Sequence, residues 1–265
     1  MRYLLLKTAL SVVLVMEFLS IAGVLQRTAL AIPNFRNISS DWRISQTYVP
    51  PDRGAPPTTT SSGTRGPQCL LSEKKIVPLL IPGNNIGITL SKHPTFFIYI
   101  PPYQEAEKAR FFLTEWISEE EIYQEDFQLP EKSGIIKIKI PAEKSAPLEI
   151  GKTYTWGVQI WCEYDPLGES ADYLSQGFIE RIEADIDLLE KLKTARPLTL
   201  PTVYASEGIW YDALESIVEL RSLNIDNPQL IDDWQKLFES ANSQGKEEFI
   251  QAPVLDCCER MEENN

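Results

Sequence analysis

The hydrophobic side chains change their spacing near residue 183, and this change limits the fold more than any other feature of the sequence. Before it, apolar and polar residues alternate in short runs, whereas after it apolar residues recur every three or four positions. Alternation is typical of β-strands, and the longer period is typical of amphipathic helices. The sequence therefore predicts an α+β protein in which a β region is followed by a helical region.

Residues 69–183 are expected to form six or seven short strands. In residues 135–140 isoleucines alternate with lysines, and in residues 153–163 one face carries Tyr154, Trp156, Val158, Ile160 and Cys162. The other runs are 75–82, 95–100, 109–114 and 177–182. Gly, Pro, Asn and Asp separate the runs, a pattern that favours an antiparallel β-sandwich. Residues 147–156 are similar to the approach to a late strand in Ig/fibronectin-III-like sandwiches.

Residues 184–244 predict a helical subdomain of three helices, the last two of which form a hairpin. Ser206 is expected to start the second helix, Asn227 and Pro228 to start the third, and Pro197 to end the first. Each helix has an apolar stripe: Ile182, Ile186, Leu189 and Leu192 in the first; Trp210, Ala213, Leu214, Ile217 and Leu220 in the second; Leu230, Ile231, Trp234, Leu237 and Phe238 in the third.

The first 31 residues predict a secretory signal. Arg2 and Lys7 form a basic start, an apolar run covers residues 9–25, and Ala29 and Ala31 are the small residues of a cleavage site. The alternative is an uncleaved membrane anchor, in which Glu17 would be unfavourable. Cleavage near Ala31 predicts a periplasmic or extracellular protein with no membrane span. Residues 32–68 then form a linker rich in Pro, Gly, Ser and Thr, and residues 245–265 form an acidic tail.

Four cysteines suit an exported protein, because disulfides persist outside the cytoplasm. Four cysteines allow three pairings. Cys69 and Cys162 flank the predicted β region, so we expect a disulfide between them, and the alternative is a pair of buried thiols. Cys257 and Cys258 are adjacent, and three outcomes stay open for them: a vicinal bridge, a bond to another chain, or free thiols.

The charged residues exclude several classes of function. The formal net charge is −13, which opposes binding to nucleic acid. His93 is the only histidine, so a two-histidine metal site and a Ser–His or Cys–His relay are not expected. No phosphate-binding loop motif occurs. Carboxylates at Glu163, Asp165, Glu169 and Asp172 favour a solvated loop over a calcium site. The sequence therefore predicts no catalytic residue, no metal ligand and no cofactor.

Three residues are candidates for a binding surface. Trp161 lies on the opposite strand face from Trp156, among polar neighbours, where it is expected either to be covered by the helices or to stack on a ligand. Trp210 and Asp212 open the second predicted helix. Asp212 is also explained by the preference of acidic residues for a helix start.

Several landmarks together resemble a known family. They are residues 63–66 shortly before Cys69, 94–101, 148–156 followed by Cys162, 177–182 and 208–214. From roughly Arg53 to Phe238 the chain resembles the cyanobacterial family catalogued as domain of unknown function 928. The resemblance implies an exported cyanobacterial protein. It implies no activity, and no catalytic residue is carried over from it.

These observations predict an exported, non-enzymatic binding or interaction module of the cell envelope, whose partner is a protein or an envelope glycan. One alternative is a carboxylate-dependent hydrolase of envelope polymers, which requires two facing carboxylates. Another is a structural component of the envelope.

Overall fold

The computed structural model describes residues 47–51, 61–63, 69–71, 80–83, 86–104, 106, 108–162, 172–223, 227–241, 243, 250–255 and 258. They belong to one compact unit, Ile44–Asn265. The predicted signal, most of the predicted linker, the run 75–79 and the acidic loop 163–171 lie outside the described residues. In the described part of the chain, no helix has the length and hydrophobicity needed to cross a membrane.

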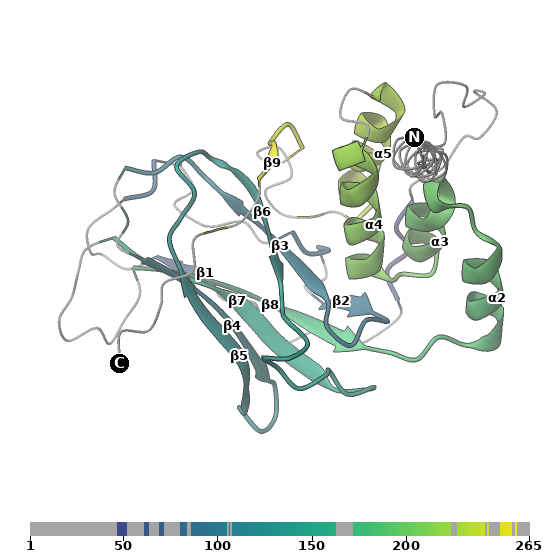
Figure 1. The fold of residues 1–265 in the computed structure, drawn as a ribbon, viewed down its shortest axis with the longest axis horizontal. Coiled ribbons are helices and arrows are strands. Elements are labelled where there is room, and N and C mark those ends of the chain that lie inside the picture. Colours follow the sequence, from purple (N-terminus) through teal and green to yellow (C-terminus); the bar gives the residue numbers. More distant parts are fainter. Residues whose placement is uncertain are drawn as a thin grey trace, which may run out of the picture. The chain divides into compact units, whose positions relative to one another are not determined.

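The fold is α+β, with two sheets and a group of helices (Figure 1). The larger sheet has the strand order β1-β8-β7-β4-β5, with β2 also paired to β8, and the smaller has the order β3-β6-β9. The pairs β2–β8 and β6–β9 are parallel, and the other pairs are antiparallel. The strands are β1 (Ser61–Gly63), β2 (Ile86–Thr89), β3 (Thr95–Ile100), β4 (Lys108–Glu115), β5 (Glu121–Phe127), β6 (Gly134–Lys139), β7 (Thr153–Trp161), β8 (Tyr173–Arg181) and β9 (Val254–Leu255).

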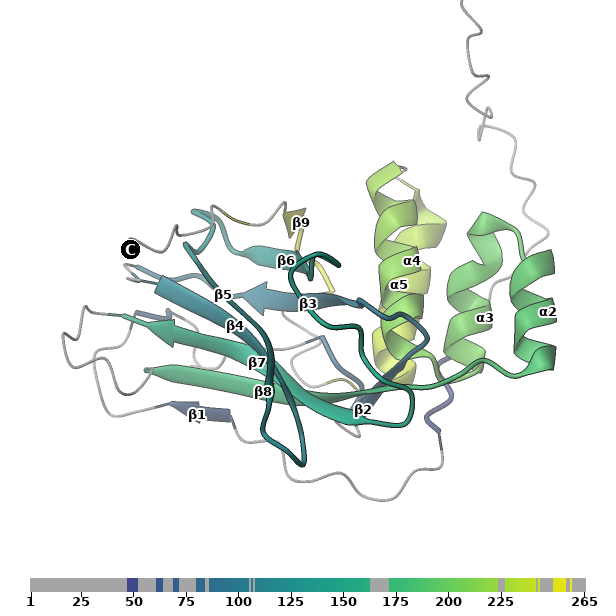
Figure 2. The same cartoon turned by 60° about the horizontal axis from the view of Figure 1, so that its bottom comes forward.

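The two sheets share one core. The smaller sheet lies over the larger one, and the helices stand at one end of both (Figure 2). Phe96 of β3 bridges the two layers, because its ring centroid lies 5.0 Å from that of Phe111 on β4 and 4.6 Å from that of Trp156 on β7. The same cluster of buried side chains extends to Trp210 of α4 and Trp234 of α5, so sheets and helices are held by continuous hydrophobic packing.

The helices are α2 (Ile186–Thr194), α3 (Leu200–Ser206), α4 (Trp210–Leu223) and α5 (Pro228–Ser240), with the short 3₁₀ turn η2 (Pro197–Thr199) before α3. Asn227 caps α5, as predicted, by accepting a hydrogen bond from the backbone N–H of Gln229. Central helix α4 contacts α3, α5, β2 and β3. It therefore connects the helical group to both sheets.

Several predictions about the helices are wrong. The region expected to hold three helices has four described α-helices, because α3 was not predicted. Ser206 ends α3 instead of capping the next helix, because Gly208, with φ at +71°, turns the chain before α4 begins at Trp210. The stripe of the first helix is also displaced. Ile186 and Leu189 are 75% and 44% exposed, and Leu188 is the buried residue. The helix starts only at Ile186, and Leu188 packs against Ile88 and Ile209. In the third helix, predicted stripe residue Ile231 is 40% exposed.

Five predicted strands are confirmed with small changes of boundary, namely β3, β4, β6, β7 and β8. Strands β1, β2, β5 and β9 were not predicted, and β1 lies within the segment expected to be a linker. In β5 only Tyr123 and Phe127 are buried, and the intervening residues are mostly polar, so the strand has little hydrophobic pattern. Strand β9 has two residues and lies in the predicted acidic tail, where it pairs with β6.

Candidate functional site

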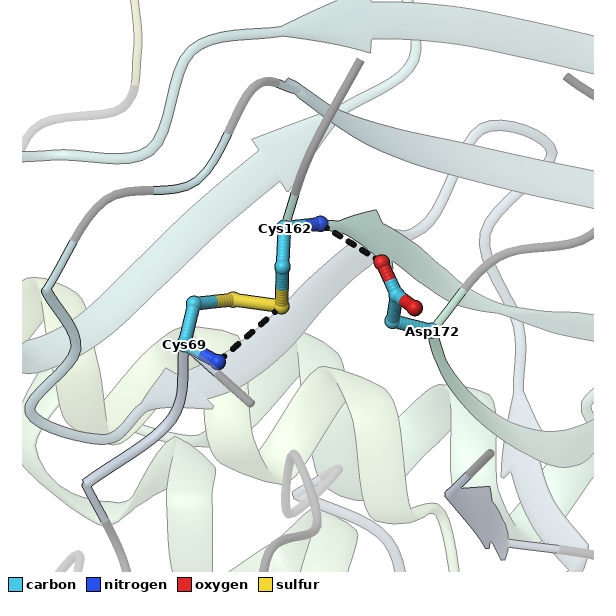
Figure 3. Close-up of a disulfide and its surroundings, with 3 residues drawn as sticks. All are labelled: Cys69, Cys162 and Asp172. Atoms are coloured by element: carbon cyan, nitrogen blue, oxygen red, sulfur yellow. Dashed lines mark hydrogen bonds between the residues drawn. A yellow bond between two sulfur atoms is a disulfide. The ribbon is translucent and has the colours of Figure 1, made fainter. Parts of the chain in front are cut away.

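The predicted disulfide between Cys69 and Cys162 is present (Figure 3). The two Cα atoms lie 5.4 Å apart, and 93 positions separate the two residues in the sequence. The backbone N–H of Cys162 donates to the carboxylate of Asp172 over 2.8 Å. The bridge therefore ties the end of β7 to the segment that precedes β2. Cys258 is also disulfide-bonded, whereas its neighbour Cys257 lies outside the described residues.

Trp161 lies at the end of β7 and is only 7% exposed. Two cations from the neighbouring strand cover its ring: Lys108 Nζ lies 4.6 Å from the ring centroid and Arg110 Cζ lies 5.5 Å from it. Both cations also pair with Asp126 of β5. The sequence favoured burial of Trp161 under the helices. Trp161 is buried, but the side chains over its ring come from strand β4 and not from the helices. Its role in ligand binding stays a prediction.

Trp210 is fully buried at the start of α4. Its indole N–H donates to the carbonyl oxygen of Leu80 over 2.9 Å, and its ring packs edge-on against Tyr48 and Phe238. These contacts give Trp210 a packing role between α4, α5 and the chain near residues 48 and 80. The binding role of Trp210 stays a prediction.

Asp212 ties α4 to the end of β2. Its Oδ2 accepts hydrogen bonds from Thr89 Oγ1 over 2.8 Å and from the backbone N–H of Leu90 over 3.1 Å. Burial of the carboxylate raises the pKa of Asp212 to about 6, although these hydrogen bonds oppose the shift. One helical turn later, Glu215 accepts from Thr95 Oγ1 over 2.6 Å. The two carboxylates therefore attach α4 to β2 and β3.

Among the described residues, no group of three or more His, Cys, Asp and Glu side chains is arranged to hold a metal ion. His93 lies at the entrance to β3, where its Nε2 is 3.4 Å from the carbonyl oxygen of Ser145. Its ring is therefore engaged with the loop that follows β6.

The most distinctive surface is the side of the larger sheet that faces away from β3, β6 and β9, which we call the outer face (the underside in Figure 2). On β4 the burial alternates strictly, with Ala109, Phe111, Leu113 and Glu115 buried on the inner side. The strand register then assigns the outer side chains: Lys108, Arg110, Phe112 and Thr114 of β4, Gln124 and Asp126 of β5, Thr155, Gly157, Gln159 and Trp161 of β7, and Leu174, Gln176 and Phe178 of β8.

One row of the outer face combines an aromatic ring with two amides. Phe112 pairs with Gln124 on one side and with Gly157 on the other, and Gly157 pairs with Gln176. The Phe112 ring leans over Gly157, because a Cβ at that position would lie 2.9 Å from Phe112 Cζ. The Phe112 side chain stays partly exposed and Gln124 is exposed. The row therefore presents an apolar ring between groups that both donate and accept hydrogen bonds.

The next row is polar and carries the charges of this face. Asp126, Arg110 and Gln159 are in register across β5, β4 and β7. Burial alone would raise the pKa of Asp126, but the hydrogen bonds and positive charges of Arg110 and Lys108 hold it below its usual value. Asp126 thus stays ionised and offsets much of the positive charge beside the Phe112 row.

Phe112, Gln124 and Gln176 were not among the candidate residues predicted from the sequence. The sequence does indicate the position of Phe112. The alternation within residues 108–115 places it on the same strand face as Arg110 and Thr114, and on the opposite face from Phe111. The glutamines required knowledge of the strand register, which brings β5 and β8 beside the other strands. A single sequence does not contain that register.

Comparison with known proteins identifies a family but no activity. A family model described as Domain of Unknown Function (DUF928) matches residues 60–254, which include both sheets and all four described α-helices. No curated protein matches the chain.

Proposed function

Since the chain belongs to the DUF928 family, whose description names no activity, we propose from the structure that it is an exported, non-enzymatic module that binds an uncharged glycan of the cell envelope. The observation that carries the proposal is the outer-face row in which partly exposed Phe112 lies over Gly157 between Gln124 and Gln176. An aromatic ring packs against the C–H face of a sugar, and amides hydrogen-bond with its hydroxyl groups.

Charge favours an uncharged ligand. The net charge of −13 opposes the approach of an acidic polymer, and Asp126 already pairs with the two cations nearest the row, Lys108 and Arg110. A neutral sugar needs no counter-charge and uses the amide and aromatic groups that the face offers. The same reasoning disfavours nucleic acid.

The alternative of a carboxylate-dependent hydrolase has less support. Asp212 and Glu215 are neighbouring acidic residues on α4. Both accept hydrogen bonds from strand residues, Asp212 from Thr89 and Leu90 and Glu215 from Thr95. These contacts explain the two carboxylates as anchors of the helix. A structural role in the envelope has no specific contact in its favour.

Export is part of the proposal. The basic, apolar and small-residue pattern of residues 1–31 supports a cleaved signal, and the Cys69–Cys162 disulfide suits an oxidising compartment such as the periplasm or the exterior. The proposed source is cyanobacterial. We also propose that the two sheets form an Ig/fibronectin-III-like sandwich and that α4 and α5 form a helical hairpin. The shared core of the two sheets supports the sandwich. The parallel pairs β2–β8 and β6–β9 do not support it, because such a sandwich is antiparallel.

The test is binding of the exported protein to insoluble uncharged polysaccharides, namely cellulose, chitin and xylan, with peptidoglycan sacculi, which carry acidic peptides, as the charged comparison. We expect retention on at least one uncharged polysaccharide, lost in Phe112→Ala and kept in Leu223→Ala, which removes an exposed apolar side chain from α4. Unfolding curves check that both variants fold. The proposal is rejected if no uncharged polysaccharide retains the protein, or if Phe112→Ala binds as well as wild type.

A further inference from the structure

Resting on the proposed function, we infer that the outer face has a second aromatic subsite at Trp116, so that the ligand is an extended glycan chain running along β4 and not a single sugar. The inference follows from the position of Trp116 relative to Phe112, the rigidity of its turn, and the small side chains between the two rings.

Trp116 lies on the same face as Phe112. Its backbone N–H donates to the carbonyl oxygen of Thr153 over 3.0 Å, which continues the β4–β7 pairing one residue beyond the end of β4. The alternation of β4 therefore extends to Trp116. Its ring packs edge-on against Phe178, with centroids 5.0 Å apart and an interplanar angle of 87°, and Phe178 is a buried residue of the outer face. Trp116 itself is 43% exposed.

The turn that carries Trp116 is held in one conformation. Buried Glu115 accepts a hydrogen bond from the backbone N–H of Ser118 over 2.6 Å, and the backbone N–H of Glu119 donates to the carbonyl oxygen of Glu115 over 3.0 Å. Hydrogen bonds from the side chain and the backbone N–H of Ser118 hold the pKa of the Glu115 carboxyl below its usual value, so the carboxylate stays ionised and keeps the contact at neutral pH. A ring that is already ordered loses little conformational entropy when a ligand stacks on it.

Small side chains separate the two rings. Thr114 and Thr155 form the row between Phe112 and Trp116, and Thr114 Oγ1 lies 3.5 Å from the carbonyl oxygen of Thr155. Four residues of strand place the two aromatic positions about 13 Å apart, whereas stacked atoms lie about 4 Å apart. One sugar ring therefore contacts only one of the aromatic rings, and a ligand that uses both must be a chain that crosses the threonine row.

The test uses oligosaccharides of two to six units derived from whichever polysaccharide of the panel retains the protein, with affinities measured by calorimetry. For wild type we expect Kd to fall by about tenfold once the chain is long enough to reach both rings. Trp116→Ala should bind the shortest oligosaccharides as wild type does and lose that gain. Phe112→Ala should weaken binding at every length, and Leu223→Ala is the control.

The outcomes separate the inference from the function on which it rests. If Trp116→Ala keeps the full length dependence while Phe112→Ala loses binding, the extended site is wrong and the glycan-binding face stands. If no oligosaccharide or polysaccharide binds, both are wrong. Trp116→Phe retains an aromatic ring and should retain most of the gain in affinity with chain length. It therefore still tests the inference if Trp116→Ala fails to fold. Quenching of Trp116 fluorescence by long but not short oligosaccharides, absent in Trp116→Phe, is the second readout.

Discussion

The indole N–H of Trp156 donates a hydrogen bond to the hydroxyl of Tyr211 over 2.6 Å, and this contact joins the larger sheet to α4. The same hydroxyl donates to the carbonyl oxygen of Phe178 over 3.3 Å. Both side chains are buried, and burial raises the pKa of Tyr211 well above its usual value, so the hydroxyl stays protonated and able to donate. Sheet and helix are therefore joined by a polar contact inside an otherwise apolar core.

Loss of this hydroxyl should destabilise the protein. Tyr211→Phe leaves the Trp156 N–H and the Phe178 carbonyl oxygen without that partner in the core, which we expect to lower the free energy of unfolding by about 1–3 kcal/mol. Urea denaturation followed by tryptophan fluorescence measures the change. Tyr204→Phe, on half-buried Tyr204 of α3, is the matched control and should change stability by less than about 0.5 kcal/mol. Equal effects of the two substitutions would show that the Trp156–Tyr211 contact contributes nothing specific.

The raised pKa of Asp212 should appear in the pH dependence of stability. Because its folded-state pKa of about 6 exceeds the ordinary value of 3.8, the folded protein binds the proton more tightly than the unfolded chain. This stabilisation is complete below pH 4 and is lost as pH rises through 6. Relative to Asp212→Asn, wild type should gain about 1 kcal/mol in free energy of unfolding when pH is lowered from 7 to 5.

The control for Asp212 is a carboxylate whose pKa is shifted in the opposite direction. Asp126 has a lowered pKa, so wild type should lose stability relative to Asp126→Asn as pH falls towards the pKa of the folded state. Urea unfolding at several pH values gives both differences. A flat difference between wild type and Asp212→Asn from pH 7 to pH 5 would contradict the buried environment of Asp212.

The sequence predicted elements whose pattern is local. The alternation at residues 135–140 and 153–161 identified β6 and β7, and Asn227 and Pro228 identified the start of α5, because strand faces and helix caps depend on neighbouring residues. The register of α2 was not predictable in the same way. Whether Leu188 or Leu189 is buried depends on where Ile88 and Ile209 lie, and these residues are distant in sequence.

The candidate site was less accessible to sequence reasoning than the fold. The alternation of β7 separated Trp161 from Trp156 correctly, but the covering of Trp161 by Lys108 and Arg110 depends on β4 lying beside β7 in one register. In the same way, Phe112 becomes the centre of a row only because Gly157 leaves space beside it. Such sites are formed by pairing between distant strands, which a single sequence does not specify.

The Cys69–Cys162 bridge should stabilise the fold substantially, since it joins residues 93 positions apart. We expect the double substitution Cys69→Ala with Cys162→Ala to lower the free energy of unfolding by about 2–5 kcal/mol, mainly by giving the unfolded chain more freedom. Urea unfolding with and without a reductant provides the control. The reductant should strongly lower the urea concentration at which half of the wild-type protein is unfolded. The double variant retains only Cys257 and Cys258, so any effect of the reductant on it reports on these two residues. A double variant as stable as oxidised wild type would contradict this, because it would show that the bridge does not restrict the unfolded chain.

Gly157 should be required for the larger sheet to pair as it does. A methyl group at this position would overlap the backbone carbonyl oxygen of Ser175 and lie 2.9 Å from both Gln176 Cα and Phe112 Cζ. The Phe112 ring has solvent to move into, but the backbone of β8 is held by its ladder with β7, so the strain falls on the β7–β8 pairing. We expect Gly157→Ala to lower the free energy of unfolding by about 1–3 kcal/mol, although alanine is normally no worse than glycine in a strand. Combining Gly157→Ala with Phe112→Ala tests the assignment, because removing the ring should restore little of the loss if the backbone of β8 is the obstacle. Full recovery in the double variant would instead place the conflict at Phe112.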